Sequence, residues 1–246
     1  MLISAMVGID SRATMDIDTT LRNYPLNCES AEQIVRQIAD VEIDDKISFV
    51  IKKTEEIMED SEYQGVRLSL DAYLDKTRIP LKIDISTGDV ITPCEISFSY
   101  QLMFENRTIP LLAYPPETVL AEKLETILSR GEANTRLRDF YDVYILQRED
   151  FVVTPDALRY ALLATCRTRG HEDLLHTYAS ILDGVRQSGA MRTQWMKYQT
   201  DFDYAAGITW DTVLDTVETL CMKTLDDHAF GDELPQEESQ FEMHLL

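Results

Sequence analysis

Short runs of alternating apolar and polar residues fill the first part of the chain, and a two-residue period is typical of half-buried strands. The pattern predicts strands within residues 12–20, 46–57, 66–74 and 78–86, and two further strands or a hairpin within 96–112. Between the first two, Asn27 and Ser30 offer caps for a helix that runs to about Val41, with Ile34, Val35 and Ile38 as its apolar stripe.

From residue 114 the spacing of apolar residues changes to that of helices. Pro115 and Pro116 end the strand region, and the segment 117–130 (ETVLAEKLETILSR) has acidic residues early and Arg130 late, as helices prefer. The same reasoning predicts helices over residues 137–147, 155–169, 172–187, 191–202 and 210–225.

These patterns divide the chain into three parts. Residues 1–113 are predicted to form an α/β (α+β) core with a mixed sheet, and residues 114–225 a helical domain. Residues 226–246 contain seven acidic residues and no Lys or Arg, which predicts a disordered acidic tail. The apolar start of the chain (MLISAMVG) has no preceding basic segment and is expected to be a buried element rather than a signal peptide.

The formal net charge of −21 narrows the range of partners. A protein that binds nucleic acid through a broad basic face would be basic, so a polyanionic substrate must here meet local cations or metal ions. No stretch reaches the roughly 20 apolar residues of a membrane span. The four cysteines are far apart, which indicates neither a zinc site nor a disulfide framework and favours the cytoplasm.

Two aspartates stand out on the first predicted strand. Asp16 and Asp18 are two residues apart, so their carboxylates emerge from one face, where a Mg²⁺ ion would relieve their repulsion. Such a pair alone is more typical of a solvated face, but its neighbours are apolar. Asp84, between two isoleucines, is a third candidate ligand. Asp71 competes for that role, and Asp84 is preferred because its strand is more apolar.

Two of the predicted helices carry charged residues that could act together, a lysine on the first and two aspartates on the second. Lys123 emerges from the apolar side of the first, and Asp139 and Asp142 share a face of the next, beside Arg138. These residues suit a site that meets phosphate charge. A network of surface ion pairs is the alternative interpretation, and it is common on helices.

Four segments, RATMDIDTTLRN, LKIDISTGD, AYPPETVLAEKLETILSR and RLRDFYDVYIL, together resemble in that order the AbiEii/AbiGii-type nucleotidyltransferase toxins. The resemblance covers roughly residues 1–150. It implies a nucleotidyltransferase fold of the polymerase-beta type, with a C-terminal helical bundle following the sheet here. It also implies a toxin of a toxin–antitoxin or abortive-infection system that transfers NMP from an NTP to an acceptor, which in some members is tRNA. The implied partner is an AbiEi-like winged-helix antitoxin.

The resemblance also assigns roles to individual residues. Asp16 and Asp18 match the Asp-x-Asp motif of the family, and Asp84 falls where the fold has its third carboxylate, so all three are expected to hold Mg²⁺. Lys123 matches the lysine of the Glu-Lys helix and is expected to meet the NTP phosphates, with Asp139 orienting it or contacting the nucleotide.

Phosphate binding is where the sequence departs from the family pattern. Arg12 and Arg138 are candidate additional phosphate contacts. The family has a Gly-Gly or Gly-Ser turn before Asp-x-Asp, whereas Gly8 stands alone here. We therefore expect either that the natural chain starts further upstream or that this chain binds NTP poorly.

Two other functions remain open from the sequence. The lack of a Gly-Gly or Gly-Ser turn before Asp-x-Asp favours a catalytically impaired, protein-binding relic of the same fold. The run Asp16-Ile17-Asp18-Thr19-Thr20 superficially matches the nucleophile motif of metal-dependent phosphohydrolases, for which no His-Asp pair stands out.

Overall fold

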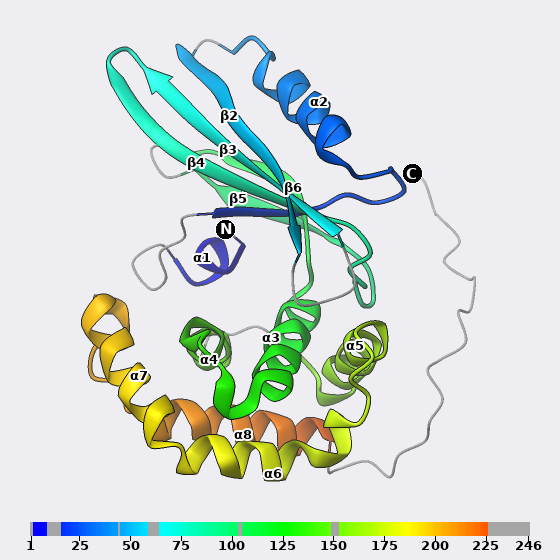
Figure 1. Cartoon of the computed structure of the whole chain (residues 1–246), viewed down its shortest axis with the longest axis vertical. Helices are drawn as coiled ribbons and strands as arrows, with labels where there is room; N and C mark the ends of the chain where they lie inside the picture. The colour runs from blue at the N-terminus through cyan, green and yellow to red at the C-terminus, as the bar shows by residue number, and fades with distance from the viewer. Residues whose placement is uncertain are drawn as a thin grey trace.

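The computed structural model describes residues 2–8, 16–43, 45–58, 64–102, 105–148 and 153–225. A sheet half, formed mainly by the first part of the chain, lies above a helical half (Figure 1). The predicted α/β fold with a mixed sheet and a following set of helices is confirmed. The tail after residue 225 lies outside the described residues.

The main sheet has four strands in the order β1-β4-β3-β2. Their bounds are β1 Asp16–Thr20, β2 Ile47–Met58, β3 Gln64–Leu74 and β4 Thr77–Ser86. β1 is parallel to β4, whereas β2, β3 and β4 pair antiparallel, so the sheet is mixed and β1 and β2 are its edges. All four strands lie where the alternating pattern predicted them.

One face of this sheet is covered by α2 (Cys28–Ala39). The helix begins at the predicted caps, because the Asn27 side chain accepts a hydrogen bond from the Ser30 N–H and the Ser30 hydroxyl accepts one from the Asn27 N–H. Val35 packs with strand residues such as Leu68 in a small core. Ile38, predicted to continue the stripe, is 67% exposed, so the packed stripe stops at Val35.

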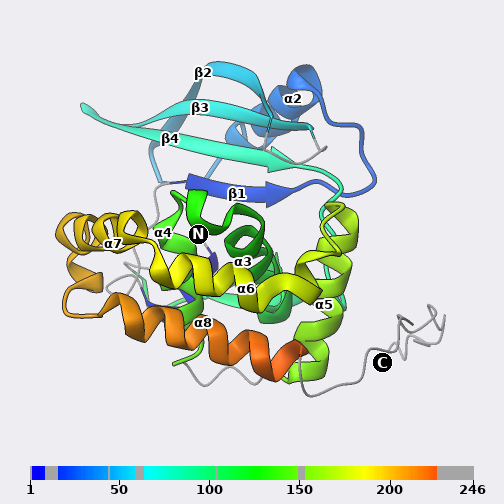
Figure 2. The same cartoon turned by 60° about the horizontal axis from the view of Figure 1, so that its bottom comes forward.

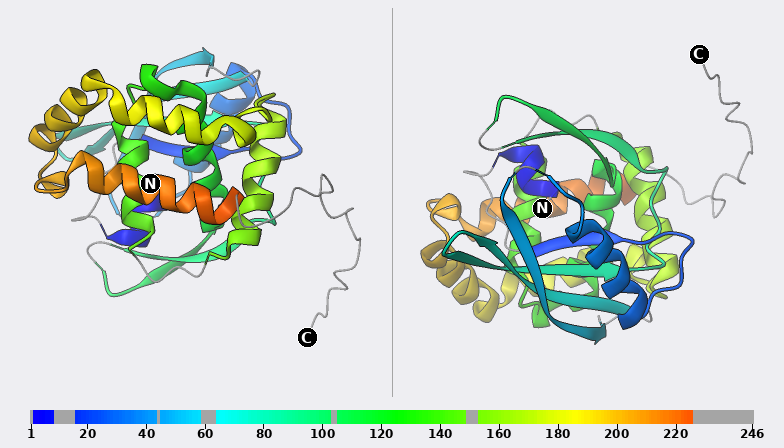
Figure 3. Two further views of the ribbon diagram at one scale, coloured as in Figure 1. Left: turned by 90° about the horizontal axis from the view of Figure 1, so that it is seen from below. Right: turned by 90° about the horizontal axis from the view of Figure 1, so that it is seen from above.

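The other face of the sheet is directed toward the helical half (Figure 3). After β4 and before α3, the chain forms a separate antiparallel pair of strands, β5 (Ile96–Gln101) and β6 (Thr108–Ala113). The helices are α3 Pro116–Arg130, α4 Leu137–Leu146, α5 Pro155–Thr168, α6 Leu174–Gln187, α7 Gly189–Asp201 and α8 Trp210–Leu225, with α6 and α8 forming the outer layer (Figure 2).

The helices share one large apolar core. Leu124 and Ile127 of α3 are completely buried in it, as is Phe140 of α4. The short N-terminal helix α1 (Leu2–Val7) belongs to this core as well, through buried Ile3 and Val7, although the sheet follows it in sequence. Within the described residues, no helix combines the length and the apolar composition needed to span a bilayer.

Leu124→Ala is expected to lower the free energy of unfolding by about 2–5 kcal/mol, because it opens a cavity in the helical core. Leu112, on β6, is 79% exposed, and Leu112→Ala should change stability by less than about 0.5 kcal/mol. Urea unfolding of both variants measures the difference. Equal losses would contradict the placement of α3 at the centre of this core.

Candidate functional site

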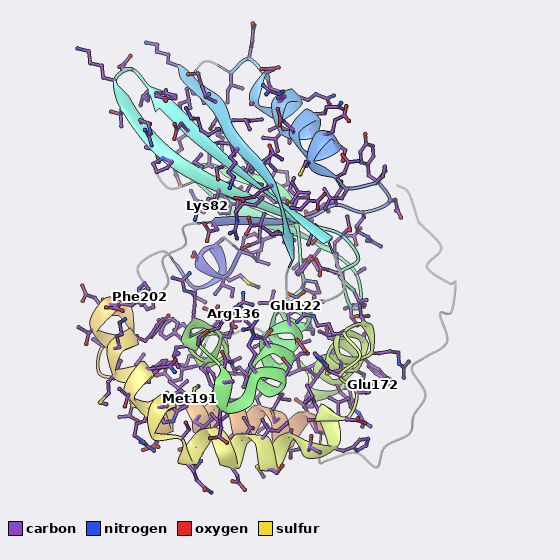
Figure 4. All side chains as sticks on the ribbon, viewed as in Figure 1. Lys82, Glu122, Arg136, Glu172, Met191 and Phe202 are labelled. Atoms are coloured by element: carbon purple, nitrogen blue, oxygen red, sulfur yellow. The ribbon has the colours of Figure 1, made fainter. Side chains whose placement is uncertain are left out.

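Three of the predicted site residues lie on one face of the main sheet. The parallel register of β1 and β4 places Asp18 opposite Asp84 and Asp16 opposite Lys82. Residues opposite one another on neighbouring strands share a face, so these four side chains project from the face that α2 does not cover. Figure 4 shows Lys82 beside β1, the part of the sheet nearest to the helices.

Asp84 is held by an arginine that the sequence did not single out. Arg67 of β3, opposite Asp84 in the register, donates from Nε to Oδ1 at 2.7 Å and from Nη2 to Oδ2 at 2.6 Å. The pKa of Arg67 is raised by these hydrogen bonds to Asp84 and, to a smaller extent, by the charges of Asp84, Asp16 and Glu55, while burial opposes the shift. Arg67 therefore partly neutralises a face that carries several carboxylates.

Mg²⁺ prefers oxygen ligands and commonly takes one or two protein carboxylates. Asp16 is half-buried and Asp18 is exposed, so both offer carboxylate oxygens of the required kind. Both oxygens of Asp84 face Arg67. Within the described residues, no three carboxylate, histidine or cysteine side chains are grouped as a ready metal site. The residues fit a magnesium ion held by Asp16 and Asp18, with Asp84 as a neighbour.

Asp71, the competitor of Asp84, lies elsewhere on the sheet. It is opposite Pro80, beyond the residues of β4 that pair with β1. Its carboxylate is 4% exposed and forms ion pairs with Arg78 at 3.1 Å and Lys52 at 3.9 Å. Asp71 is thus part of an ion-pair cluster on β2, β3 and β4, and Asp84 is the carboxylate beside Asp18.

A second group of charged residues comes from the helical half. Lys123 of α3 lies 2.5 Å from Asp139 Oδ1 and 3.3 Å from Asp142 Oδ2, both on α4. Asp139 is 3% exposed and Asp142 is fully buried, so these ion pairs differ from the surface network considered above. They join α3 to α4, and removal of the lysine would leave two buried carboxylates without this counter-charge.

Arg136, immediately before α4, is a further site residue that the sequence did not reveal. Its Nε lies 3.6 Å from Asp139 Oδ2, a buried oxygen that accepts no hydrogen bond within the described part of the chain. Figure 4 places Arg136 on the side of the helical half that faces the sheet. Arg138, the predicted phosphate contact, instead lies over the ring of Phe202, 5.3 Å from its centroid. Arg12 lies outside the described residues.

Hydroxyl groups around Asp89 connect the two halves near the site. Its Oδ2 accepts hydrogen bonds from Thr20 at 2.9 Å, Ser86 at 2.5 Å and Tyr114 at 3.1 Å. Burial and the charge of Asp89 raise the pKa of Tyr114, so its hydroxyl stays a donor. Thr20 and Ser86 end β1 and β4, two residues after Asp18 and Asp84. Asp89 therefore fixes the carboxylate-bearing strands relative to the start of α3.

Comparison with known proteins places the chain among nucleotidyltransferases. The model of the family "Nucleotidyl transferase AbiEii toxin, Type IV TA system" matches residues 1–216. No protein with a curated description matches the sequence. A solved structure described provisionally as a nucleotidyltransferase from Helicobacter pylori is 14% identical, covers 94% of this chain and 88% of its own, and has a TM-score of 0.44. JHP933 from Helicobacter pylori is 13% identical over 92% of this chain and 84% of its own, also with a TM-score of 0.44.

The family match extends beyond the four segments that carried the resemblance and includes α3 to α7 and the first part of α8. It confirms the family inferred from those segments. The chain belongs to the AbiEii nucleotidyltransferase toxin family of type IV toxin–antitoxin systems.

Proposed function

We propose that the protein is a Mg²⁺-dependent toxin of the cytoplasm that transfers NMP from an NTP to an RNA acceptor such as tRNA. The observation that carries this proposal is the register of β1 and β4, which puts Asp16 and Asp18 beside Asp84 on the face directed toward the helices. The family match supplies the reaction class, nucleotidyl transfer.

Asp16 and Asp18 would hold the metal through their carboxylates, from the edge of the sheet. When bound, Mg²⁺ supplies charge that offsets the NTP phosphates and favours ionisation of the attacking hydroxyl. Asp84 lies next to Asp18 and would act as a base or as a further ligand. In either role it would exchange at least one of its hydrogen bonds with Arg67.

The cations around these carboxylates suit the phosphates of the substrate. Arg67 is on β3, opposite Asp84 of β4, and exposed Lys82 is opposite Asp16. Lys123 and Arg136 would add charge from the helical half, with Asp139 orienting both. This arrangement would let a protein of formal charge −21 bind a polyanion at one place.

The partner that we propose is an AbiEi-like antitoxin encoded in the same system. The type IV toxin–antitoxin family to which the chain belongs implies an antitoxin. We propose that this antitoxin is a winged-helix protein.

The bidentate hydrogen bonding of Arg67 to Asp84 favours a second candidate, a catalytically impaired relic that binds proteins. In that case Asp84 would stay with Arg67 permanently. Calorimetric titration with each NTP and Mg²⁺ separates the two candidates, since the relic would bind none of them.

Asp16→Asn and Asp18→Asn are each expected to reduce transfer of label from α-³²P-NTP to RNA by about 100-fold or more, because each removes a charged metal ligand. Asp183→Asn, at an exposed position on α6, is the matched control and should transfer label as the parent does. Parent-like labelling by both site variants would refute the metal assignment.

Lys123→Met is expected to lower the free energy of unfolding by about 3 kcal/mol, because two buried carboxylates lose their cation. It should also raise the KM for NTP at a temperature where the variant stays folded. Lys223→Met, at an exposed position on α8, is the control for both measurements. If stability falls while KM is unchanged, Lys123 is only structural.

A further inference from the structure

The described part of the chain has two apolar cores, and they are built from different residues. One core belongs to the helices, and the other lies between α2 and the main sheet. The proposed metal ligands stand on the sheet, whereas Lys123 and Arg136 lie in or next to the helices. Parts of a chain that share no large apolar interface tend to move relative to one another. A nucleotide that contacts both groups therefore needs another link that fixes their separation.

Asp89 supplies such a link through one carboxylate oxygen. Its Oδ2 accepts hydrogen bonds from the hydroxyls of Thr20 and Ser86, the last residues of β1 and β4. The same oxygen accepts a hydrogen bond from Tyr114, which lies between β6 and α3. The Thr20 hydroxyl is also hydrogen-bonded to those of Ser86, at 3.1 Å, and Tyr114. Three segments that are distant in sequence thus meet at one atom.

Tyr114 takes part in both halves of the protein. Its ring packs against the helical core, while its hydroxyl reaches the ends of the two strands. Hydrogen bonds to an ionised acceptor are roughly twice as strong as those between neutral groups. Asp89 therefore joins the strands that carry Asp18 and Asp84 to a side chain anchored among the helices.

A second attachment follows three residues after Asp89. The Thr92 N–H donates to Thr118 Oγ1 at 2.9 Å, and that hydroxyl donates to the Thr92 carbonyl oxygen at 3.0 Å. Thr118 is 1% exposed and lies in the first turn of α3, the helix that carries Lys123. Asp89 also lines a small cleft together with Glu122, the neighbour of Lys123. The segment from Asp89 to Thr92 is therefore bonded to the strands at one end and to α3 at the other.

We infer that Asp89 is a positioning residue for nucleotide binding. It holds the carboxylates of the sheet and the cations of the helical half at the separation at which one nucleotide contacts both. The inference rests on the proposed function, because the nucleotide of that reaction is what bridges the two groups. Asp89 acts through the hydroxyls that it binds, so the place of its acceptor oxygen matters more than its charge.

Calorimetric titration of the full chain with Mg²⁺ and a non-hydrolysable NTP analogue tests this role. Asp89→Ala should raise the dissociation constant about tenfold, whereas Asp89→Asn keeps an acceptor oxygen and should stay within about threefold of the parent. Asp183→Ala, at an exposed position on α6, is the matched control and should bind as the parent does. Parent-like binding by Asp89→Ala would overturn the inference. An Asp89→Asn variant as weak as Asp89→Ala would overturn it too, because charge and not position would then be what matters.

A double-mutant cycle separates positioning from a general loss of stability. Arg136→Gln removes a cation whose side chain is 53% exposed, and urea unfolding confirms that each variant is folded. The double variant with Asp89→Ala should bind more tightly than the product of the two separate fold-changes predicts, because an absent cation cannot be misplaced. Fold-changes that simply multiply would contradict a positioning role.

Hydrogen exchange without nucleotide distinguishes this inference from the proposed function. Asp89→Ala should speed exchange of the amides of Leu21 and Thr92, which are bonded across the linked segments, and leave that of Ile127 in the helical core unchanged. Unchanged exchange at both positions means that Asp89 does not join the halves. A parent that binds no nucleotide overturns the positioning role together with the proposed function, and the exchange result then still decides whether Asp89 links the halves.

Discussion

Repulsion between carboxylates on one face of the sheet is the constraint on which the site depends. The parallel pairing of β1 with β4 sets Asp18 beside Asp84, with Asp16 two residues away on the same face. Like charges that share a face on neighbouring strands repel one another. Arg67 offsets part of this cost through its two hydrogen bonds to Asp84. A divalent cation between Asp16 and Asp18 would offset more, which is why the same arrangement that is costly alone suits a metal site.

The helical half also contains neighbouring carboxylates, and there a lysine side chain supplies the opposite charge. Asp139 and Asp142 are buried, and Lys123 from the neighbouring helix supplies their counter-charge. That ion pair fixes α4 against α3. Asp89, bonded to hydroxyls from β1, β4 and Tyr114, connects this half to the strands. Arg136, beside Asp139, lies on the side of the helical half that faces the sheet (Figure 4).

Local pattern was sufficient to predict most of the elements. The alternation in VRLSLDAYL and RIPLKIDIS gave the strands, and Asn27 with Ser30 gave the start of α2, because these signals act over a few residues. The pairing of Lys123 with Asp139 was suggested by their helical positions and by the family resemblance, and the structure brings them to 2.5 Å. The place of α1 in the helical core was not foreseen, because it depends on contacts with segments more than 100 residues away.

The two site residues that the sequence did not reveal were missed for different reasons. Arg67 reaches Asp84 only through the register of β3 with β4, and a strand sequence does not determine its partner's register. Arg136 rather than Arg138 lies by Asp139, because α4 begins at Leu137 and Arg138 is turned toward Phe202. Ile38 matched the apolar stripe of α2, yet it is 67% exposed and lies outside the small core that α2 forms with the sheet.

Metal binding by Asp16 and Asp18 can be measured apart from catalysis. Electron paramagnetic resonance detects free Mn²⁺, which replaces Mg²⁺ at oxygen-ligand sites, in the presence of a non-hydrolysable NTP analogue. The parent should lower free Mn²⁺ below the level that the analogue alone sets, whereas the double variant Asp16→Asn, Asp18→Asn should not. Equal depletion by the folded double variant, or none by the parent, would contradict metal binding by this pair.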